Sequence, residues 1–154
     1  MYRFTKTIDV ALPPEEVFKF STNIYNVCLM VPDYINVKIF EGSESLVKGD
    51  PVKLKINIFG ISFMWESVIE EYEKDVYFFD RMIKGPFKRW EHKHFFEKSE
   101  KGTLLTDQVD YELPLFGLGA VANKLFVNKM INGIFTFRHD YDMGGENKNF
   151  GCKV

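Results

Sequence analysis

Two histidines and two aspartates are the residues of this sequence whose types and spacing suit chemistry. His92 and His94 are separated by one residue, with a carboxylate before them at Asp80 and another after them at Asp107. Side chains alternate between the two faces of a β-strand, so both imidazoles would share one face. Imidazole and carboxylate groups together can transfer protons, anchor a polar ligand or bind a metal ion.

The strands expected around these residues decide whether the four side chains meet. Residues 88–98 and 102–113 are expected to form a hairpin whose register sets His94 opposite Asp107. A three-residue turn at 85–87 likewise sets Asp80 opposite His92. Other residues of the same face also meet in this register, which supports it: Phe96 with Leu105, Trp90 with Tyr111, and Phe78 with His94.

An ionised group on an apolar face is unfavourable unless it is paired, so this polar cluster needs an explanation. Three interpretations stay open. The cluster is an internal network that fixes the sheet register, a ligand-anchoring or acid/base pair at a pocket, or a metal site of two His and two Asp. No further ligand spacing supports the last of these, and we therefore expect neither a metal nor another cofactor.

The remaining chain predicts an α+β domain. Residues 2–11 alternate as a half-buried strand, and a short helix over about 14–22 is followed by one or two further turns up to Met30. Six antiparallel strands are then expected, at 34–41, 51–59, 61–72, 76–84, 88–98 and 102–113. From Leu118 to Phe137 apolar residues recur with a helical period, which predicts one long C-terminal helix. A curved sheet of about seven strands wrapped round that helix would cover its apolar face.

Aromatic residues are unusually frequent, with 16 Phe, 7 Tyr and 2 Trp in 154 residues. Two explanations are open: these residues fill a dense core, or they line a pocket for an apolar ligand. The gap expected between a sheet and one helix favours a pocket. The expected ligand-binding residues surround the polar cluster: Trp65, Phe78, Asp80, Met82, Trp90, His92, His94, Phe96, Asp107, Tyr111, Phe126, Met130 and Ile134.

Composition excludes several classes of protein. Twenty Lys and Arg nearly balance 22 Asp and Glu, so a nucleic-acid partner is not expected. No apolar run has the roughly 20 residues of a membrane-spanning helix, and residues 1–6 hold no signal-peptide hydrophobic region. Cys28 and Cys152 lack metal-ligand spacing, from which we expect a reducing, cytoplasmic setting. We expect one domain over 1–142, a flexible tail over 143–154, and a monomer or weak homodimer.

Several short motifs follow one another in a recognisable order. They are Pro14-Glu15-Glu16-Val17-Phe18, Trp65-Glu66-Ser67-Val68-Ile69, Phe78-Phe79-Asp80, Gly85-Pro86-Phe87, the run Trp90 to Phe96, and Ile134-Phe135 with Arg138. Together they resemble the START-like superfamily, most closely its SRPBCC branch, often labelled polyketide cyclase/dehydrase-like. The resemblance implies a helix-grip fold, as in Bet v 1-like proteins, with a deep hydrophobic cavity. Relatives often carry Gln where this chain has Met82.

Three functions are compatible with these features. The first is binding or carriage of a hydrophobic small molecule such as a lipid, quinone or polyketide, because aromatic residues surround few polar anchors. An alternative, which the resemblance also implies, is a polyketide cyclase or dehydratase-like enzyme. There His94 and Asp107 would act as acid and base, while Tyr111 or His92 polarises a carbonyl. A second alternative is a protein-interaction module with an exposed apolar patch.

Overall fold

The computed structural model describes residues 1–114, 127 and 129–136. Within them, seven strands form one antiparallel sheet in the order β1-β7-β6-β5-β4-β3-β2. The elements are β1 (Tyr2–Val10), α1 (Pro14–Thr22), the 3-10 helix η1 (Ile24–Leu29), β2 (Ile35–Glu41), β3 (Pro51–Ile58), β4 (Ile61–Glu73), β5 (Tyr77–Lys84), β6 (Arg89–Ser99) and β7 (Gly102–Glu112). Every expected strand is present, with ends within two residues of those expected.

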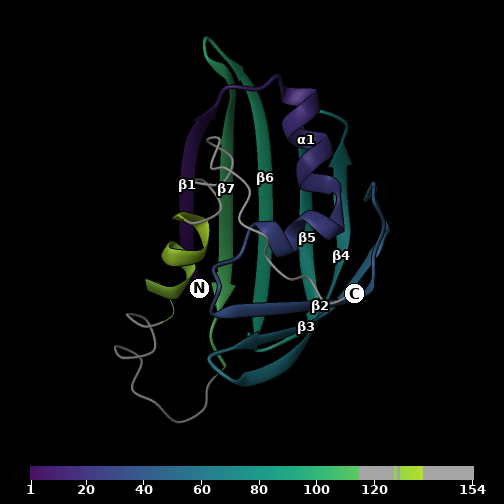
Figure 1. Cartoon of the computed structure of the whole chain (residues 1–154), viewed down its shortest axis with the longest axis vertical. Coiled ribbons are helices and arrows are strands. Elements are labelled where there is room, and N and C mark those ends of the chain that lie inside the picture. The colour runs from purple at the N-terminus through teal and green to yellow at the C-terminus, as the bar shows by residue number, and fades with distance from the viewer. Residues whose placement is uncertain (115–126, 128, 137–154) are drawn as a thin grey trace.

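The sheet is strongly curved, and β2 and β3 cross the ends of the longer strands (Figure 1). The pairing of β4 with β5 shifts register between Glu66 and Ser67 and again between Ile69 and Glu71. Such bulges bend a strand and increase its twist, so they contribute to this curvature. The curvature gives the sheet a concave face on which apolar side chains gather.

Helix α1 and the helical residues 129–136 both lie on this face (Figure 1). Pro14 begins α1, where the missing N–H is not needed, and Glu15 and Glu16 suit the positive end of the helix dipole. From α1, Phe18 makes edge-on contacts with Tyr72, Phe78 and Phe96, at centroid distances of 5.1–5.9 Å. Such contacts add about 0.5–1.5 kcal/mol each beyond apolar burial, so Phe18 fixes α1 to the sheet.

The hairpin between β6 and β7 has the predicted register. His94 is opposite Asp107, Trp90 is opposite Tyr111, and Ser99 pairs with Gly102 at the turn. Gly102 has a φ of 141°, and a Cβ there would lie 2.4 Å from the carbonyl oxygen of Val10. Glycine is therefore required at this turn, where β7 begins close to the end of β1.

The pairing of β5 with β6 also has the predicted register, since Asp80 is opposite His92 and Phe78 is opposite His94. The expected three-residue turn at 85–87 is wrong, because the pairing of β5 with β6 ends at Arg81 and Glu91. Beyond that point β5 stays paired with β4 alone, as in the pair of Met82 with Ser67. Phe87, in the connection from β5 to β6, packs against Trp65 on β4 and Trp90 on β6, with ring centroids 6.3 and 4.7 Å apart.

The expected C-terminal helix from Leu118 to Phe137 is present in the structure over residues 129–136. The rest of that expectation, including Phe126 and the tail over 143–154, lies outside the described residues. Ile131 and Phe135 are buried against Val109 and Tyr111, so this face of the helix packs on β7. None of the described helices is both long enough and apolar enough to span a membrane.

Candidate functional site: a cavity with a histidine–aspartate network

A cavity of about 530 Å³ lies between the concave face of the sheet, η1 and helix residues 127 and 130–135. This volume falls in the range of small-molecule pockets. Most of the lining side chains are aliphatic or aromatic. On the sheet and its β3–β4 turn they include Ile35, Val37, Val52, Leu54, Ile56, Ile58, Phe59, Ile61, Phe63, Trp65, Ile69, Phe78 and Trp90, and on the helical segments Ile24, Val27, Met30, Val127, Met130, Ile131, Ile134 and Phe135.

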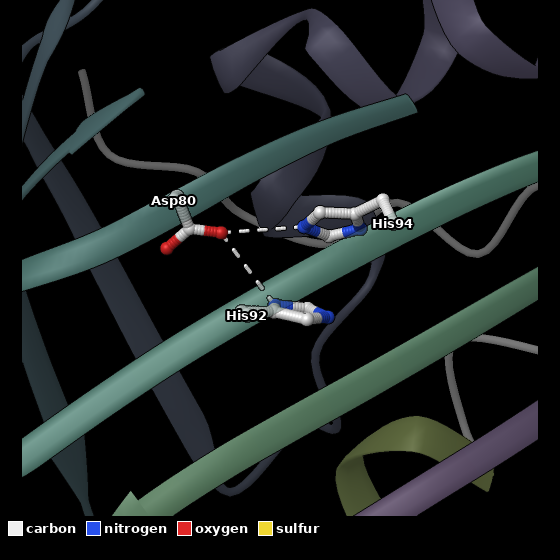
Figure 2. A group of neighbouring side chains, drawn as sticks. All are labelled: Asp80, His92 and His94. Atoms are coloured by element: carbon white, nitrogen blue, oxygen red, sulfur yellow. Dashed lines mark hydrogen bonds and ion pairs between the residues drawn. The ribbon is translucent and has the colours of Figure 1, made fainter. Parts of the chain in front are cut away.

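Asp80, His92 and His94 are the ionisable side chains among the described residues that line this cavity. They come from neighbouring positions on β5 and β6, and Figure 2 shows both imidazole rings turned toward the Asp80 carboxylate. Oδ2 of Asp80 lies 3.3 Å from Nε2 of His94 and 3.7 Å from Nδ1 of His92. The cavity therefore has one cluster of ionisable side chains set in a mostly apolar wall.

Asp107 lies behind the two imidazoles, completely buried. Its Oδ1 accepts a hydrogen bond of 2.9 Å from Nε2 of His92. Nδ1 of His94 lies equally close to the same oxygen, but the direction of the contact does not make a hydrogen bond, and none of the other described residues bonds to this buried nitrogen. Each imidazole therefore has one nitrogen facing Asp80 at the cavity and the other facing Asp107 in the interior.

The surroundings of the network favour the neutral form of His92. Burial lowers the pKa of His92 below its ordinary value and the neighbouring His94 lowers it further, while Asp107 and Asp80 act in the opposite sense. A neutral imidazole has one N–H. In His92 the hydrogen bond to Asp107 places that proton on Nε2, which leaves the lone pair of Nδ1 facing Asp80.

Aromatic packing fixes both rings. Phe78 stacks on the His94 ring at a centroid distance of 3.9 Å, and Phe135 contacts the His92 ring edge-on at 5.2 Å. The two imidazoles are themselves 3.7 Å apart. The polar network thus lies between the core cluster built on Phe18 and the cluster built on Ile131, and neither ring has room to turn freely.

The other predicted ligand-binding residues divide into those that line the cavity and those that do not. Trp65, Phe78, Trp90, Met130 and Ile134 line it together with the three polar residues. Four further predicted residues are buried but do not line the cavity: Met82, Phe96, Asp107 and Tyr111. Phe126 lies outside the described residues. Strand alternation finds the correct face, but it does not show which residues of that face other side chains cover.

The predicted pairing of His94 with Asp107 also needs revision. The two residues are opposite each other in the register, but the hydrogen bond to Asp107 comes from His92, which lies diagonally across the strands. Backbone pairing fixes which residues are neighbours, whereas side-chain rotamers decide which of them bond.

Sequence reasoning missed the rim of the cavity. Phe59 and Ile61, at the turn between β3 and β4, line the cavity although 68% and 72% of their surface is exposed. Tyr34 stacks on Phe59 with parallel rings 4.7 Å apart. The cavity therefore reaches the surface beside this turn. Two apolar residues flanking Gly60 in an otherwise turn-like segment were the available signal.

Sequence reasoning also missed Lys6. This residue is directly opposite Asp107 in the pairing of β1 with β7, on the inward face of the sheet. Its Nζ donates a hydrogen bond of 2.6 Å to Oγ1 of Thr136 in the C-terminal helix. Lys6 thus directs its charge to the helix.

Cys28, which we expected to be reduced, is disulfide-bonded and so gives no support to a reducing setting.

A curved antiparallel sheet that encloses an apolar cavity beneath helices defines the helix-grip class of proteins. The family described as polyketide cyclase/dehydrase and lipid transport matches residues 10–135, and the chain belongs to this family within the START-like superfamily. A comparison with curated protein sequences finds no match.

Solved structures show the same fold at low sequence identity. The Zhui aromatase/cyclase from Streptomyces sp. R1128 is 13% identical with a TM-score of 0.75, over 92% of this chain and 91% of that one. A START superfamily protein from Mycobacterium smegmatis is 17% identical with a TM-score of 0.69, over 91% and 96% of the two chains. The protein TTHA0849 from Thermus thermophilus is 14% identical with a TM-score of 0.69, over 91% and 94%.

Proposed function

We propose that this protein binds and carries a hydrophobic small molecule, such as a lipid, quinone or polyketide, in the cavity between sheet and helices. The observation that supports this most directly is an apolar cavity of about 530 Å³ that reaches the surface at Phe59 and Ile61. Folded interiors are normally packed with few voids larger than a water molecule. A cavity of this size in so aromatic a chain favours an occupant.

The polar network suggests how such a ligand is oriented. A pocket of this type is mostly apolar, with a few polar groups that fix the ligand. Here Asp80, His92 and His94 occupy one region of the wall. An elongated apolar molecule with one hydrogen-bonding end would place that end at the network and its apolar body along β3 and β4.

Tryptophan fluorescence provides a direct test, because Trp65 and Trp90 are the two tryptophans of the chain and both line the cavity. Titration with a fatty acid, a quinone and an aromatic polyketide should change the emission saturably at one ligand per chain. Native mass spectrometry of the same samples should show the complex. If none of the three classes binds at micromolar concentration, the proposal is overturned.

A second candidate function is a cyclase or dehydratase-like enzyme acting on a polyketide ring. Its support is that two imidazoles and a carboxylate line the cavity. Asp107 and Tyr111 do not, so any proton exchanged with a ligand would pass through Asp80, His92 or His94, with Asp107 orienting the imidazoles from behind. His94→Gln should then abolish turnover of an aromatic polyketide while leaving its binding intact, whereas a pure carrier shows no turnover to lose.

The remaining parts of the proposal concern partners and location. A near-neutral net charge of −2 supports the absence of a nucleic-acid partner. A monomer or weak homodimer and a single domain over 1–142 stay predictions, which light scattering and limited proteolysis would test. The cytoplasmic location also stays a prediction.

A further inference from the structure

Three side chains, Asp80, His92 and His94, each bring one potential ligand atom to the polar end of the cavity. The Nε2–H of His92 is donated to Asp107, so Nδ1 of His92 presents a lone pair toward Oδ2 of Asp80, 3.7 Å away. Nε2 of His94 forms a hydrogen bond of 3.3 Å with the same Asp80 oxygen. The lone pair of His92 Nδ1 has no proton between it and the Asp80 carboxylate, an unfavourable contact that a cation at this point would relieve.

We propose that Asp80, His92 and His94 bind a divalent transition-metal ion of the zinc class. One ligand atom from each of the three side chains lies within 4.8 Å of the others. The two distances from Asp80, 3.3 and 3.7 Å, bracket the separation of about 3.4 Å between two ligands of tetrahedral zinc. Two imidazoles and one carboxylate are a ligand set that zinc and iron sites use.

Asp107 supplies the outer support that such a site needs. A metal-bound histidine usually donates its second N–H to a carboxylate, which fixes the ring and its tautomer. Here one buried oxygen of Asp107 lies 2.9 Å from the second nitrogen of both His92 and His94. Within the described part of the chain the buried Nδ1 of His94 has no hydrogen-bond partner, and this arrangement would give it one. A small rotation of that ring on metal binding would direct its N–H at Asp107.

The charge of the site also favours a bound metal ion. Asp80 is a carboxylate whose side chain is only 17% exposed, and a divalent cation bound to it would offset its charge. Because Asp80, His92 and His94 all line the cavity, the remaining coordination positions of the ion would face it. An oxygen donor at the polar end of a bound ligand would occupy those positions.

The test uses the full chain without a histidine tag, stripped with a chelator and checked for retained fold by circular dichroism. Isothermal titration with Zn²⁺ should give one site per chain, and Co²⁺ should give the visible absorption of a low-coordinate nitrogen and oxygen site. Asp80→Asn, His92→Gln and His94→Gln should each weaken binding at least about 100-fold. Zn²⁺ should raise the Tm of the wild-type protein and have little effect on these variants.

Glu91→Gln is the matched control, because Glu91 lies between the ligands on β6 but faces the other side and contacts Arg89 at 2.7 Å. This variant should bind Zn²⁺ as the wild type does. Absence of a one-to-one site in the folded protein, or equal weakening by Glu91→Gln and Asp80→Asn, would overturn the proposal. The proposed carrier function is tested separately, by titrating Asp80→Asn with the apolar ligands and following tryptophan fluorescence. Ligand binding by this variant would leave the carrier function standing even if the metal site is absent.

Discussion

Nε2 of His92 lies 2.9 Å from Oδ1 of Asp107, although the two residues belong to different strands and are not directly opposite each other. Asp107 is fully buried and His92 is 8% exposed. Removing one member of such a buried pair lowers the free energy of unfolding, because the remaining polar group stays buried without a hydrogen-bond partner.

Replacing Asp107 should therefore reveal how much the network stabilises the fold. Asp107→Ala leaves the His92 N–H without its acceptor and should lower the free energy of unfolding by about 3 kcal/mol. Asp107→Asn keeps an acceptor oxygen and should lower it by less. Urea unfolding of the two variants measures the difference. A loss below about 0.5 kcal/mol for Asp107→Ala would show that the pair has no structural role.

Filling the cavity should remove ligand binding without unfolding the protein. Ser67 is buried and lines the cavity, so Ser67→Phe projects a ring into it. We expect binding of the ligand found by fluorescence titration to weaken at least about tenfold, which corresponds to a loss of about 1.4 kcal/mol. Val68→Phe, next along the strand and not part of the lining, should bind normally. Equal affinities of the two variants would place the ligand elsewhere.

Acid should remove the contribution that ionised Asp110 makes to the stability of the fold. Its carboxylate accepts hydrogen bonds of 2.6 and 2.8 Å from Arg3, and this holds the pKa of Asp110 below its usual value. A carboxyl whose pKa is lower in the folded state stabilises the fold above its unfolded pKa and loses that effect as the pH falls through the folded pKa.

At neutral pH, Asp110→Asn should therefore melt below the wild type, by no more than about 3 °C because Arg3 is exposed. The difference should shrink below about pH 4 and vanish in strong acid. Differential scanning calorimetry at a series of pH values measures it. A constant difference down to the lowest pH would mean that Asp110 acts through packing and not through charge.

A substitution in the turn beside the cavity rim should stabilise the fold. Phe59 has a φ of 50° and Gly60 a φ of 86°. Positive φ at both central residues suits Asn-Gly, while a bulky residue there is strained. Phe59→Asn should raise the free energy of unfolding by up to about 1 kcal/mol. It also removes the ring that stacks on Tyr34, and stopped-flow fluorescence should show faster ligand entry. A less stable variant would mean that the stack outweighs the strain.

Local patterns were enough to predict the sheet. Strand alternation and the positions of Gly85, Pro86 and Gly102 indicated the register of β5, β6 and β7, because shifting a strand by one residue would turn its apolar side chains to solvent. The same patterns placed His92, His94, Asp80 and Asp107 together. They did not predict the longer connection before Trp90, which depends on packing of Phe87 between two tryptophans far apart in sequence.

The sequence by itself thus determined which side chains share the inward face, since alternation along a strand is a local property of the backbone. Only the tertiary structure decided which of them a ligand can reach, because curvature and covering helices depend on contacts between distant residues. It buried Asp107 and Tyr111 behind the wall and left Asp80, His92 and His94 on the cavity. It also selected the diagonal bond from His92 to Asp107, a matter of rotamers that strand pairing alone does not fix.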